Sequence, residues 1–257
     1  FIAVGSMWGQ QGMITGLLLG GMMNVVAWFF SDKIAIASMQ GREVTAQTGG
    51  DLYRMVDELR RRADLPMPRV YICPHEAPNA FATGRSPRKA AVAVTQGLLR
   101  VLDRDELEGV IAHELAHIKN RDTLTSCIAA TISGVLAFIA QWGMLFGGGQ
   151  NREGANPLAM FLTLILAAVG AALIKAAISR SREYVADAHA ARIVGSPRGL
   201  VSALQKIEMY AQRIPLVQPN PAQNNLFIIE PFGGNAAIRL FATPPPTESR
   251  IRALMNG

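Results

Sequence analysis

The chain has 257 residues, of which half are hydrophobic and only 17% are charged, and its formal net charge is +6 at neutral pH. With only two cysteines, Cys73 and Cys127, a domain built on disulfide bonds is excluded. The excess of Lys and Arg would suit nucleic acid, but these residues gather beside long apolar stretches, where anionic lipid headgroups attract them. We therefore expect a membrane protein that has the lipid bilayer as a partner and no nucleic acid.

The first 31 residues contain no charged side chain, and about 20 mostly apolar residues are enough to cross a bilayer. The sequence Gly9-Gln10-Gln11-Gly12 interrupts this stretch, so we predict a spanning helix at about residues 13–30, preceded by the end of another segment. A signal peptide is a poor alternative, because no basic region precedes the apolar run. Residues 1–31 are thus predicted to form an N-terminal membrane region.

Residues 32–122 contain many basic side chains and are predicted to form one part of a soluble α+β unit. We expect a helix at residues 51–63, a strand near residues 69–72, and a β-rich segment that continues to Thr95. Residues 79–82 form an edge-strand candidate, where Asn79 and Ala80 would bind an extended peptide by strand addition. The alternative is an ordinary loop that ends in Gly84.

The most informative feature follows in the pentapeptide His113-Glu114-Leu115-Ala116-His117. Asp103 and Glu106 have the spacing of a helix start, so the two imidazoles should lie one turn apart on one helix face and bind a single metal ion. Zn²⁺ suits this donor pair, and Glu114 stands where a carboxylate can take a proton from a water molecule. The chemistry indicated is peptide-bond hydrolysis.

Residues 123–151 and 154–174 carry no charge, which predicts a transmembrane hairpin over residues 123–178. Its helices should span about residues 125–146 and 158–178, joined by a turn at residues 147–153. The basic segments on either side then place residues 32–122 and 179–257 in the cytoplasm by the positive-inside rule. This orientation brings the two soluble parts to the same side of the membrane.

A catalytic zinc needs a third protein donor, and our choice is Glu183. Asp187 shares its helix face and would orient one of the imidazoles. The rival donors are His75, His189 and Glu208; we interpret the two histidines as surface or packing residues. After Glu183 we predict a helical stretch through Ala211, followed by a loop at residues 215–221.

Several motifs resemble the HtpX heat-shock proteases, a family of bacterial integral-membrane zinc metalloproteases, and the resemblance covers nearly the whole chain. It rests on residues 65–68 (LPMP), 78–84 (PNAFATG), 91–95 (AVAVT), the histidine helix through Asp122, and residues 179–184 (SRSREY). The resemblance implies a mainly helical α+β, multi-pass protein with a cytoplasmic zincin-like metalloprotease domain in the inner membrane. It also implies four spans, so that residues before the predicted 13–30 helix would be the stub of a first span.

By position, the resemblance assigns His113, His117 and Glu183 to zinc and Glu114 to catalysis. The C-terminal segment, residues 241–251, departs from the family motif because Pro244 stands where histidine is usual. Proline can neither donate a hydrogen bond nor carry charge, so that histidine's role in stabilising an oxyanion does not carry over. Arg250 keeps its family position and is an oxyanion candidate, with a structural ion pair as the alternative.

Together these features predict a zinc metalloendopeptidase with one Zn²⁺ per chain. The family resemblance implies that its substrates are misfolded or damaged membrane proteins and that it can cleave itself. One alternative is a narrow processing protease that resembles the CAAX prenyl-protein endoproteases. The other is a membrane scaffold in which zinc only joins the histidine helix to the returning hairpin. The sequence leaves the oligomeric state open.

Overall fold

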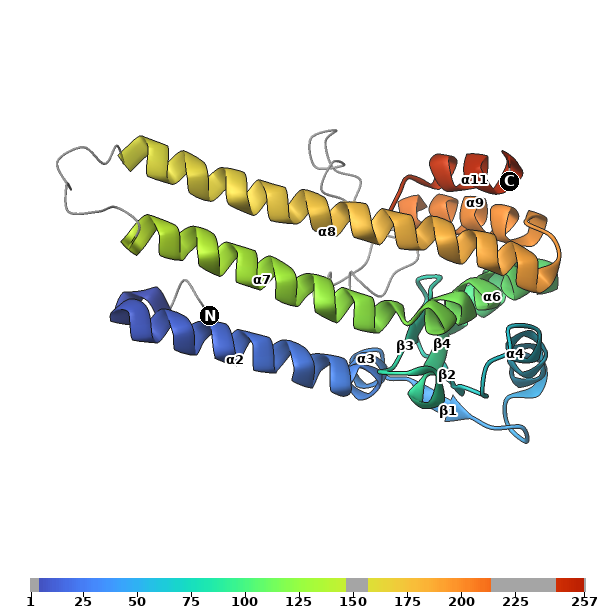
Figure 1. Ribbon diagram of the computed structural model, residues 1–257. Helices are drawn as coiled ribbons and strands as arrows, with labels where there is room; N and C mark the ends of the chain where they lie inside the picture. The colour runs from blue at the N-terminus through green and yellow to red at the C-terminus, as the bar shows by residue number, and fades with distance from the viewer. Residues whose placement is uncertain (1–4, 147–156, 214–243, 257) are drawn as a thin grey trace.

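The computed structural model describes residues 5–146, 157–213 and 244–256. Three long helices run side by side and project from a rounded unit that contains the sheet and the shorter helices (Figure 1). They are α2 (Gly9–Phe29), α7 (Asp122–Phe146) and α8 (Pro157–Val194). The predicted turn at residues 147–153 and the predicted loop at residues 215–221 lie outside the described residues.

Helix α2 begins four residues before the predicted span, so the prediction that Gly9-Gln10-Gln11-Gly12 interrupts the helix was wrong. A glycine costs a helix only about 1 kcal/mol relative to alanine, which an otherwise apolar helix tolerates. A short 3₁₀ helix, η1 (Ser6–Trp8), precedes α2. At Gly12 a side chain is excluded by space, because a Cβ there would lie 2.1 Å from the carbonyl oxygen of Gly5.

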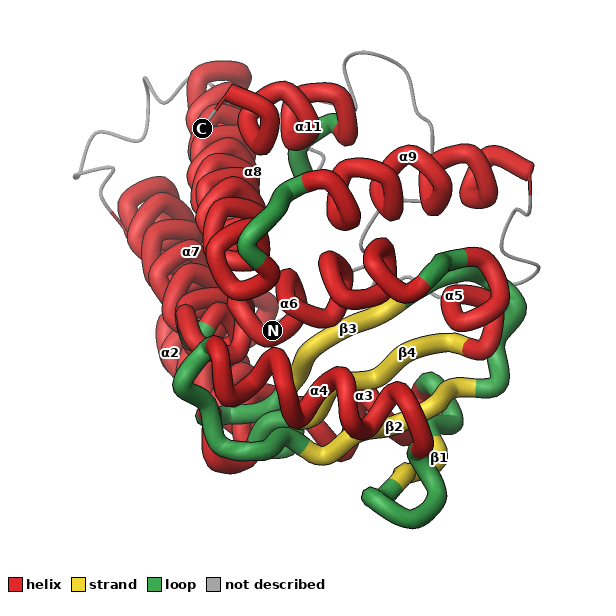
Figure 2. The backbone as a smooth tube through the Cα atoms, turned by 90° about the vertical axis from the view of Figure 1, so that its right-hand side faces the viewer, coloured by secondary structure: helices red, strands yellow, loops and turns green. Residues whose placement is uncertain are grey.

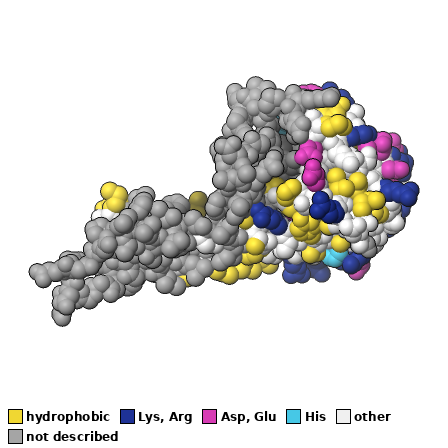
Figure 3. Space-filling model, turned by 90° about the horizontal axis from the view of Figure 1, so that it is seen from above, with side chains coloured by type: hydrophobic (Ala, Val, Ile, Leu, Met, Phe, Trp, Pro, Cys, Tyr) yellow, Lys and Arg dark blue, Asp and Glu magenta, His cyan; other side chains and the backbone are white. Residues whose placement is uncertain are grey.

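We define the helical arm as α2, α7 and residues 157–178 of α8. Among the described residues, α2 is the helix that is long and apolar enough to cross a bilayer by length and composition. Many of its exposed side chains are large and apolar, with Leu18 67% and Met22 56% exposed. Where Figure 3 colours the surface, charged side chains lie on the rounded unit.

Four strands form one mixed sheet in the order β1-β2-β4-β3. They are β1 (Arg42–Val44), β2 (Arg69–Cys73), β3 (Ala80–Thr83) and β4 (Ala91–Thr95). Strands β2 and β4 are parallel, whereas the two outer pairs are antiparallel. The sequence predicted β2 and the edge position of β3, but it did not predict β1.

Alternating side chains of the sheet enter two different cores. Val70, Val92 and Val94 face α4 (Gly50–Arg62) and α6 (Arg104–Asn120), whereas Tyr71 and Ala93 belong to the core under α3 (Ser31–Ser38). Because both faces are covered, every residue of β4 is buried. Two short helices, η2 (Pro87–Lys89) and α5 (Gln96–Val101), flank β4 along the chain.

The C-terminal part of the chain completes the rounded unit. The second half of α8, α9 (Arg198–Arg213) and α11 (Thr247–Asn256) pack together, and α8 and α9 pack on α6 (Figure 2). The helical stretch predicted through Ala211 is present as two helices, since Gly195 ends α8 with a φ of +89°. The expectation of a mainly helical α+β fold is confirmed.

Candidate metal centre

Helix α6 positions the histidine pair through a strong local start signal. The Asp103 side chain accepts from the backbone N–H of Glu106, and the Glu106 side chain accepts from that of Asp103, which is a complete capping box. His113 and His117 then lie one turn apart with ring centroids separated by 4.6 Å. His113 is 2% exposed and Glu114 is 4% exposed, so both polar side chains are held inside the protein.

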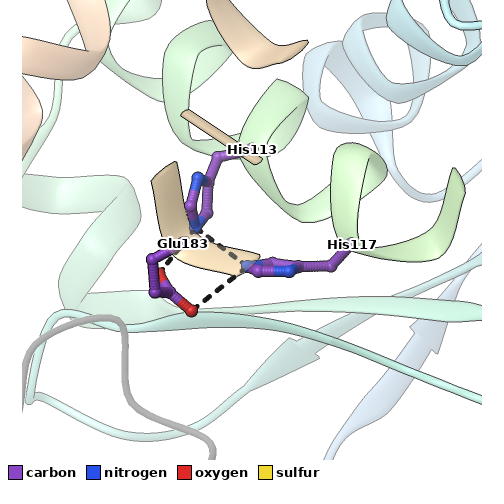
Figure 4. A group of neighbouring side chains, drawn as sticks. All are labelled: His113, His117 and Glu183. Atoms are coloured by element: carbon purple, nitrogen blue, oxygen red, sulfur yellow. Dashed lines mark hydrogen bonds and ion pairs between the residues drawn. The ribbon is translucent and has the colours of Figure 1, made fainter. Parts of the chain in front are cut away.

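The third donor arrives from α8, more than 60 residues further along the chain. Glu183 Oε2 lies 3.5 Å from His113 Nε2, Glu183 Oε1 lies 3.6 Å from His117 Nε2, and the two Nε2 atoms are 3.0 Å apart (Figure 4). All three donor atoms lie within 4.8 Å of one another. Figure 4 shows the two imidazoles and the carboxylate pointing toward a common centre.

These separations fit a zinc ion. Two ligand atoms at tetrahedral zinc lie roughly 3.4 Å apart, given zinc–nitrogen and zinc–oxygen bonds of about 2.0–2.2 Å. The three separations between the donor atoms, 3.0, 3.5 and 3.6 Å, bracket that value. Two imidazoles and one carboxylate are also a donor set that catalytic zinc uses, with a fourth position left open.

Asp187 lies behind His113, on the side away from the proposed metal position. Its Oδ1 atom is 2.9 Å from His113 Nδ1, and both side chains are 2% exposed. Arg250 from α11 donates two hydrogen bonds to the Asp187 carboxylate, of 2.8 Å from Nε and 2.6 Å from Nη2. Asp187 therefore lies beside an imidazole while Glu183, one helix turn away, faces the proposed metal position, as their four-residue spacing predicted.

The side chains of His113, Glu183, Asp187 and Arg250 shift one another's pKa values. Burial disfavours the charged forms of Glu183 and Asp187, but the pairing with His113 and Arg250 outweighs it and lowers both carboxyl pKa values, that of Glu183 to about 2. Burial likewise opposes charge on His113, yet the two carboxylates raise its pKa to about 10. The pocket thus favours positive charge at the place where a metal cation would replace the His113 proton.

Arg250 is 1% exposed, and its guanidinium contacts the interior of the site. Besides Asp187, it lies 3.4 Å from Glu183 Oε2 and 3.4 Å from His113 Nε2. Pro244 is part of the segment that leads into α11. Of the two roles that the sequence left open for Arg250, the structure contains the ion pair.

His117 has a carboxylate partner that the sequence reasoning missed. Asp122 Oδ2 lies 2.5 Å from His117 Nδ1, and the two side chains are 12% and 18% exposed. Asp122 is the first residue of α7 and follows Arg121, whose φ of 55° turns the chain at the end of α6. A polar residue five positions after the second histidine was the available signal, but its direction depends on that left-handed turn.

The rival donors lie elsewhere. His75 Nε2 is 3.1 Å from the carbonyl oxygen of Met39, and His189 and Glu208 are not members of the donor group found in the described part of the chain. His189 Nδ1 is buried without a hydrogen-bond partner there. Their positions leave Glu183 as the third donor that the geometry favours.

The two candidate substrate residues lie at the edge strand. Asn79 is 0% exposed and Ala80 is 1% exposed, and the backbone of Asn79 is hydrogen-bonded to Thr95 beside it. These two side chains therefore pack inside the protein and do not face an added peptide. Strand addition would use the backbone N–H and C=O groups of β3. A small cavity lies between the turn after β3 and the end of α6, lined by residues that include Gly84, Arg85 and His117.

Comparisons with known proteins show which proteins this chain is similar to. The model of peptidase family M48 matches residues 46–256. Proteins described as "Protease HtpX homolog" from Nostoc punctiforme and Pyrococcus furiosus are each 50% identical, over 253 and 250 residues. Both alignments cover 96% of this chain, with 87% of the first relative and 86% of the second. The resemblance to HtpX proteases is confirmed.

A solved structure shares the fold. The crystal structure of S. mikatae Ste24p superposes with a TM-score of 0.60 at 16% sequence identity. The match covers 98% of this chain and 61% of that chain. At this identity the likeness concerns the fold alone.

Proposed function

The chain belongs to peptidase family M48, and from that premise we propose that it is a membrane zinc endopeptidase in which His113, His117 and Glu183 hold one Zn²⁺. The observation that carries the proposal is the convergence of these donors from α6 and α8 within 4.8 Å. Metalloprotease activity follows from the family. Zinc as the particular metal is supported by the donor set and its spacing.

Glu114 is the residue to which we assign proton transfer. When bound, zinc supplies a Lewis acid that polarises the scissile carbonyl and acidifies a water molecule. Glu114 follows His113 directly on α6, and its carboxylate takes the proton from the attacking water and gives it to the departing amine. At 4% exposure, this carboxylate is shielded from bulk solvent.

Asp187 and Arg250 support the site without contacting substrate in this proposal. Asp187 Oδ1 lies 2.9 Å from Nδ1 of His113, and in this proposal the ion pair keeps the hydrogen on Nδ1 so that Nε2 presents its lone pair to the metal. Arg250 holds Asp187 through two hydrogen bonds. We therefore assign Arg250 to the support of the metal ligands and not to the oxyanion.

We further propose that extended segments of misfolded or damaged membrane proteins are the substrates, with self-cleavage as a special case. The edge position of β3 supports this, since a peptide can add to that edge through its backbone, next to Asn79 and Ala80. The apolar, exposed surface of α2 supports a location in the bacterial inner membrane. The excess of basic residues beside the apolar stretches supports a multi-pass arrangement with the catalytic side in the cytoplasm.

The scaffold alternative has less support. A closed structural zinc site normally has four protein ligands, and it has no use for a carboxylate such as Glu114 next to an open position. The likeness to Ste24p concerns the fold and does not favour a narrow processing specificity.

The test is the replacement Glu114→Gln in the full chain. We expect zinc binding to be unchanged and cleavage of a model membrane substrate to fall at least about 100-fold, because the amide cannot accept the proton. The control is Glu108→Gln, the same change on α6 beside an exposed arginine, which should leave activity near that of the parent. Full activity of the Glu114 variant would remove this residue from catalysis.

A further inference from the structure

We propose that Asp122 is a positioning residue for His117, an inference that rests on the proposed metal site. Its carboxylate oxygen lies 2.5 Å from His117 Nδ1, a short distance for a contact between a ring nitrogen and a carboxylate. His117 is more exposed than His113, at 18% against 2% for the side chains. It therefore has less packing to fix the plane of its ring, and a directed contact matters more.

The contact determines which nitrogen of His117 faces the metal position. A neutral imidazole has one N–H and one lone pair, and an ionised carboxylate only accepts. With Asp122 at Nδ1, the hydrogen is kept on that nitrogen, and Nε2 presents its lone pair toward His113 and Glu183, 3.0 and 3.6 Å away. Asp187 Oδ1 lies 2.9 Å from the Nδ1 atom of His113, so each histidine has a carboxylate beside that nitrogen.

Asp122 itself is fixed from two sides. The left-handed turn at Arg121, whose N–H bonds to carbonyls at the end of α6, returns the chain toward His117. Arg182 of α8 donates a 2.9 Å hydrogen bond to the Asp122 carbonyl oxygen and another to the hydroxyl of Ser126. Since Arg182 directly precedes Glu183, the same part of α8 holds both Asp122 and the third donor.

Stabilisation of the start of α7 by the Asp122 charge has to be distinguished from the positioning of His117. Asp122 lies in the first turn of α7, where a negative charge stabilises a helix by roughly 0.3–1 kcal/mol. A serine at this position can still accept hydrogen bonds at the helix start but cannot reach His117 with a charged oxygen. Asp51 offers a matched control, because it is also an aspartate in the first turn of a helix, α4, and lies outside the site.

The experiment measures zinc affinity by competition with a chelator, using the full chain in detergent. For Asp122→Ser and Asp122→Asn we expect zinc to bind about 10- to 100-fold more weakly, the usual effect of removing such a partner. The visible spectrum of the Co²⁺ form should also change, because the His117 ring is no longer held. Asp51→Ser should match the parent in both measurements.

The outcomes separate the inference from the proposed function. If the parent binds no zinc, the proposed function fails. If the parent binds zinc and the Asp122 variants bind it within twofold of the parent, only the positioning role fails. Thermal unfolding of the metal-free proteins completes the test: a variant that is folded and within a few degrees of the parent supports positioning, whereas loss of the metal-free fold contradicts it.

Discussion

Arg250 is a cationic side chain with 1% exposure, and it lies among Asp187, Glu183 and His113. Such burial is costly unless the charge is paired and hydrogen-bonded, which the two bonds to Asp187 provide. This pairing raises the pKa of Arg250 against the opposing effect of burial and keeps the Asp187 pKa low. The site is therefore a network in which each charge depends on its partner.

This network predicts that Arg250→Gln destabilises the metal-free protein strongly. Removing one partner of a buried ion pair costs roughly 3–5 kcal/mol, because Asp187 keeps a buried charge. Arg252→Gln, an exposed change on the same helix, should stay within about 0.5 kcal/mol of the parent. Thermal unfolding in one detergent compares the two; equal midpoints would contradict the importance of the buried pair.

At the residue scale, the sequence predicted those site residues whose relation is local. His113, Glu114 and His117 lie on one helix, and Glu183 and Asp187 lie one turn apart on another, so helical spacing was enough within each group. The link between the two groups came from the need of zinc for a third donor and from the family resemblance. The contact between Asp122 and His117 was missed because it depends on the left-handed backbone conformation of Arg121. The Arg250 pair joins side chains 63 positions apart, and no periodic pattern reports such a distance.

At the element scale, Glu106 joins two helices as well as starting one. Its carboxylate accepts from Ser202 Oγ at 2.6 Å and from Lys206 Nζ at 2.7 Å, so it links the start of α6 to α9. Gly109 and Gly199 permit this close packing, since a Cβ at Gly109 would lie 2.5 Å from the backbone nitrogen of Leu200. The histidine helix is thus held at its start by the C-terminal part of the chain.

This link predicts a dependence of stability on acid. Burial favours the neutral form of Glu106, but hydrogen bonds from Lys206, Ser202 and the Asp103 backbone outweigh it and lower the pKa below its ordinary value. Stabilisation by a carboxylate with a lowered pKa is complete above the unfolded pKa of about 4.3 and is lost as pH falls through the folded pKa. Glu106→Gln should be destabilised by about 1–3 kcal/mol at pH 7 and lose this part of the acid dependence.

The measurement is the unfolding midpoint of Glu106→Gln and of the parent between pH 3 and pH 7, on the order of five points. Glu108→Gln is the control on the same helix. A constant difference between the Glu106 variant and the parent down to the lowest pH would contradict the assigned pairing.

Among the elements, those with a strong local signal were predicted and those without one were not. Helix α6 has its capping box, and α4 has an apolar face and basic end, so both were expected with nearly their observed bounds. Strand β1 has only three residues, Arg42–Val44, two of them exposed, and it forms because β2 pairs with it. The early start of α2 was missed because the glycines there allow close packing with Gly5 and do not end the helix.

At the scale of the whole molecule, two distant parts of the chain build one site at the base of the helical arm (Figure 1). Helix α8 extends from the arm into the rounded unit without interruption and carries Glu183 to the histidines of α6. Arg182 donates a hydrogen bond to the carbonyl oxygen of Asp122 in α7. The next residue, Glu183, contacts His113 and His117. Because α8 is one continuous helix, it holds the helical arm and the metal centre in a fixed position relative to each other.

The most direct test of this account is the zinc content of the full chain, its Glu183→Ala variant and its Glu208→Ala variant, measured by elemental analysis after dialysis against a weak chelator. We predict about one zinc per chain for the parent and for Glu208→Ala, and almost none for Glu183→Ala, because two imidazoles alone do not hold a catalytic zinc. A Glu183→Ala protein that retains as much zinc as the parent would contradict the account.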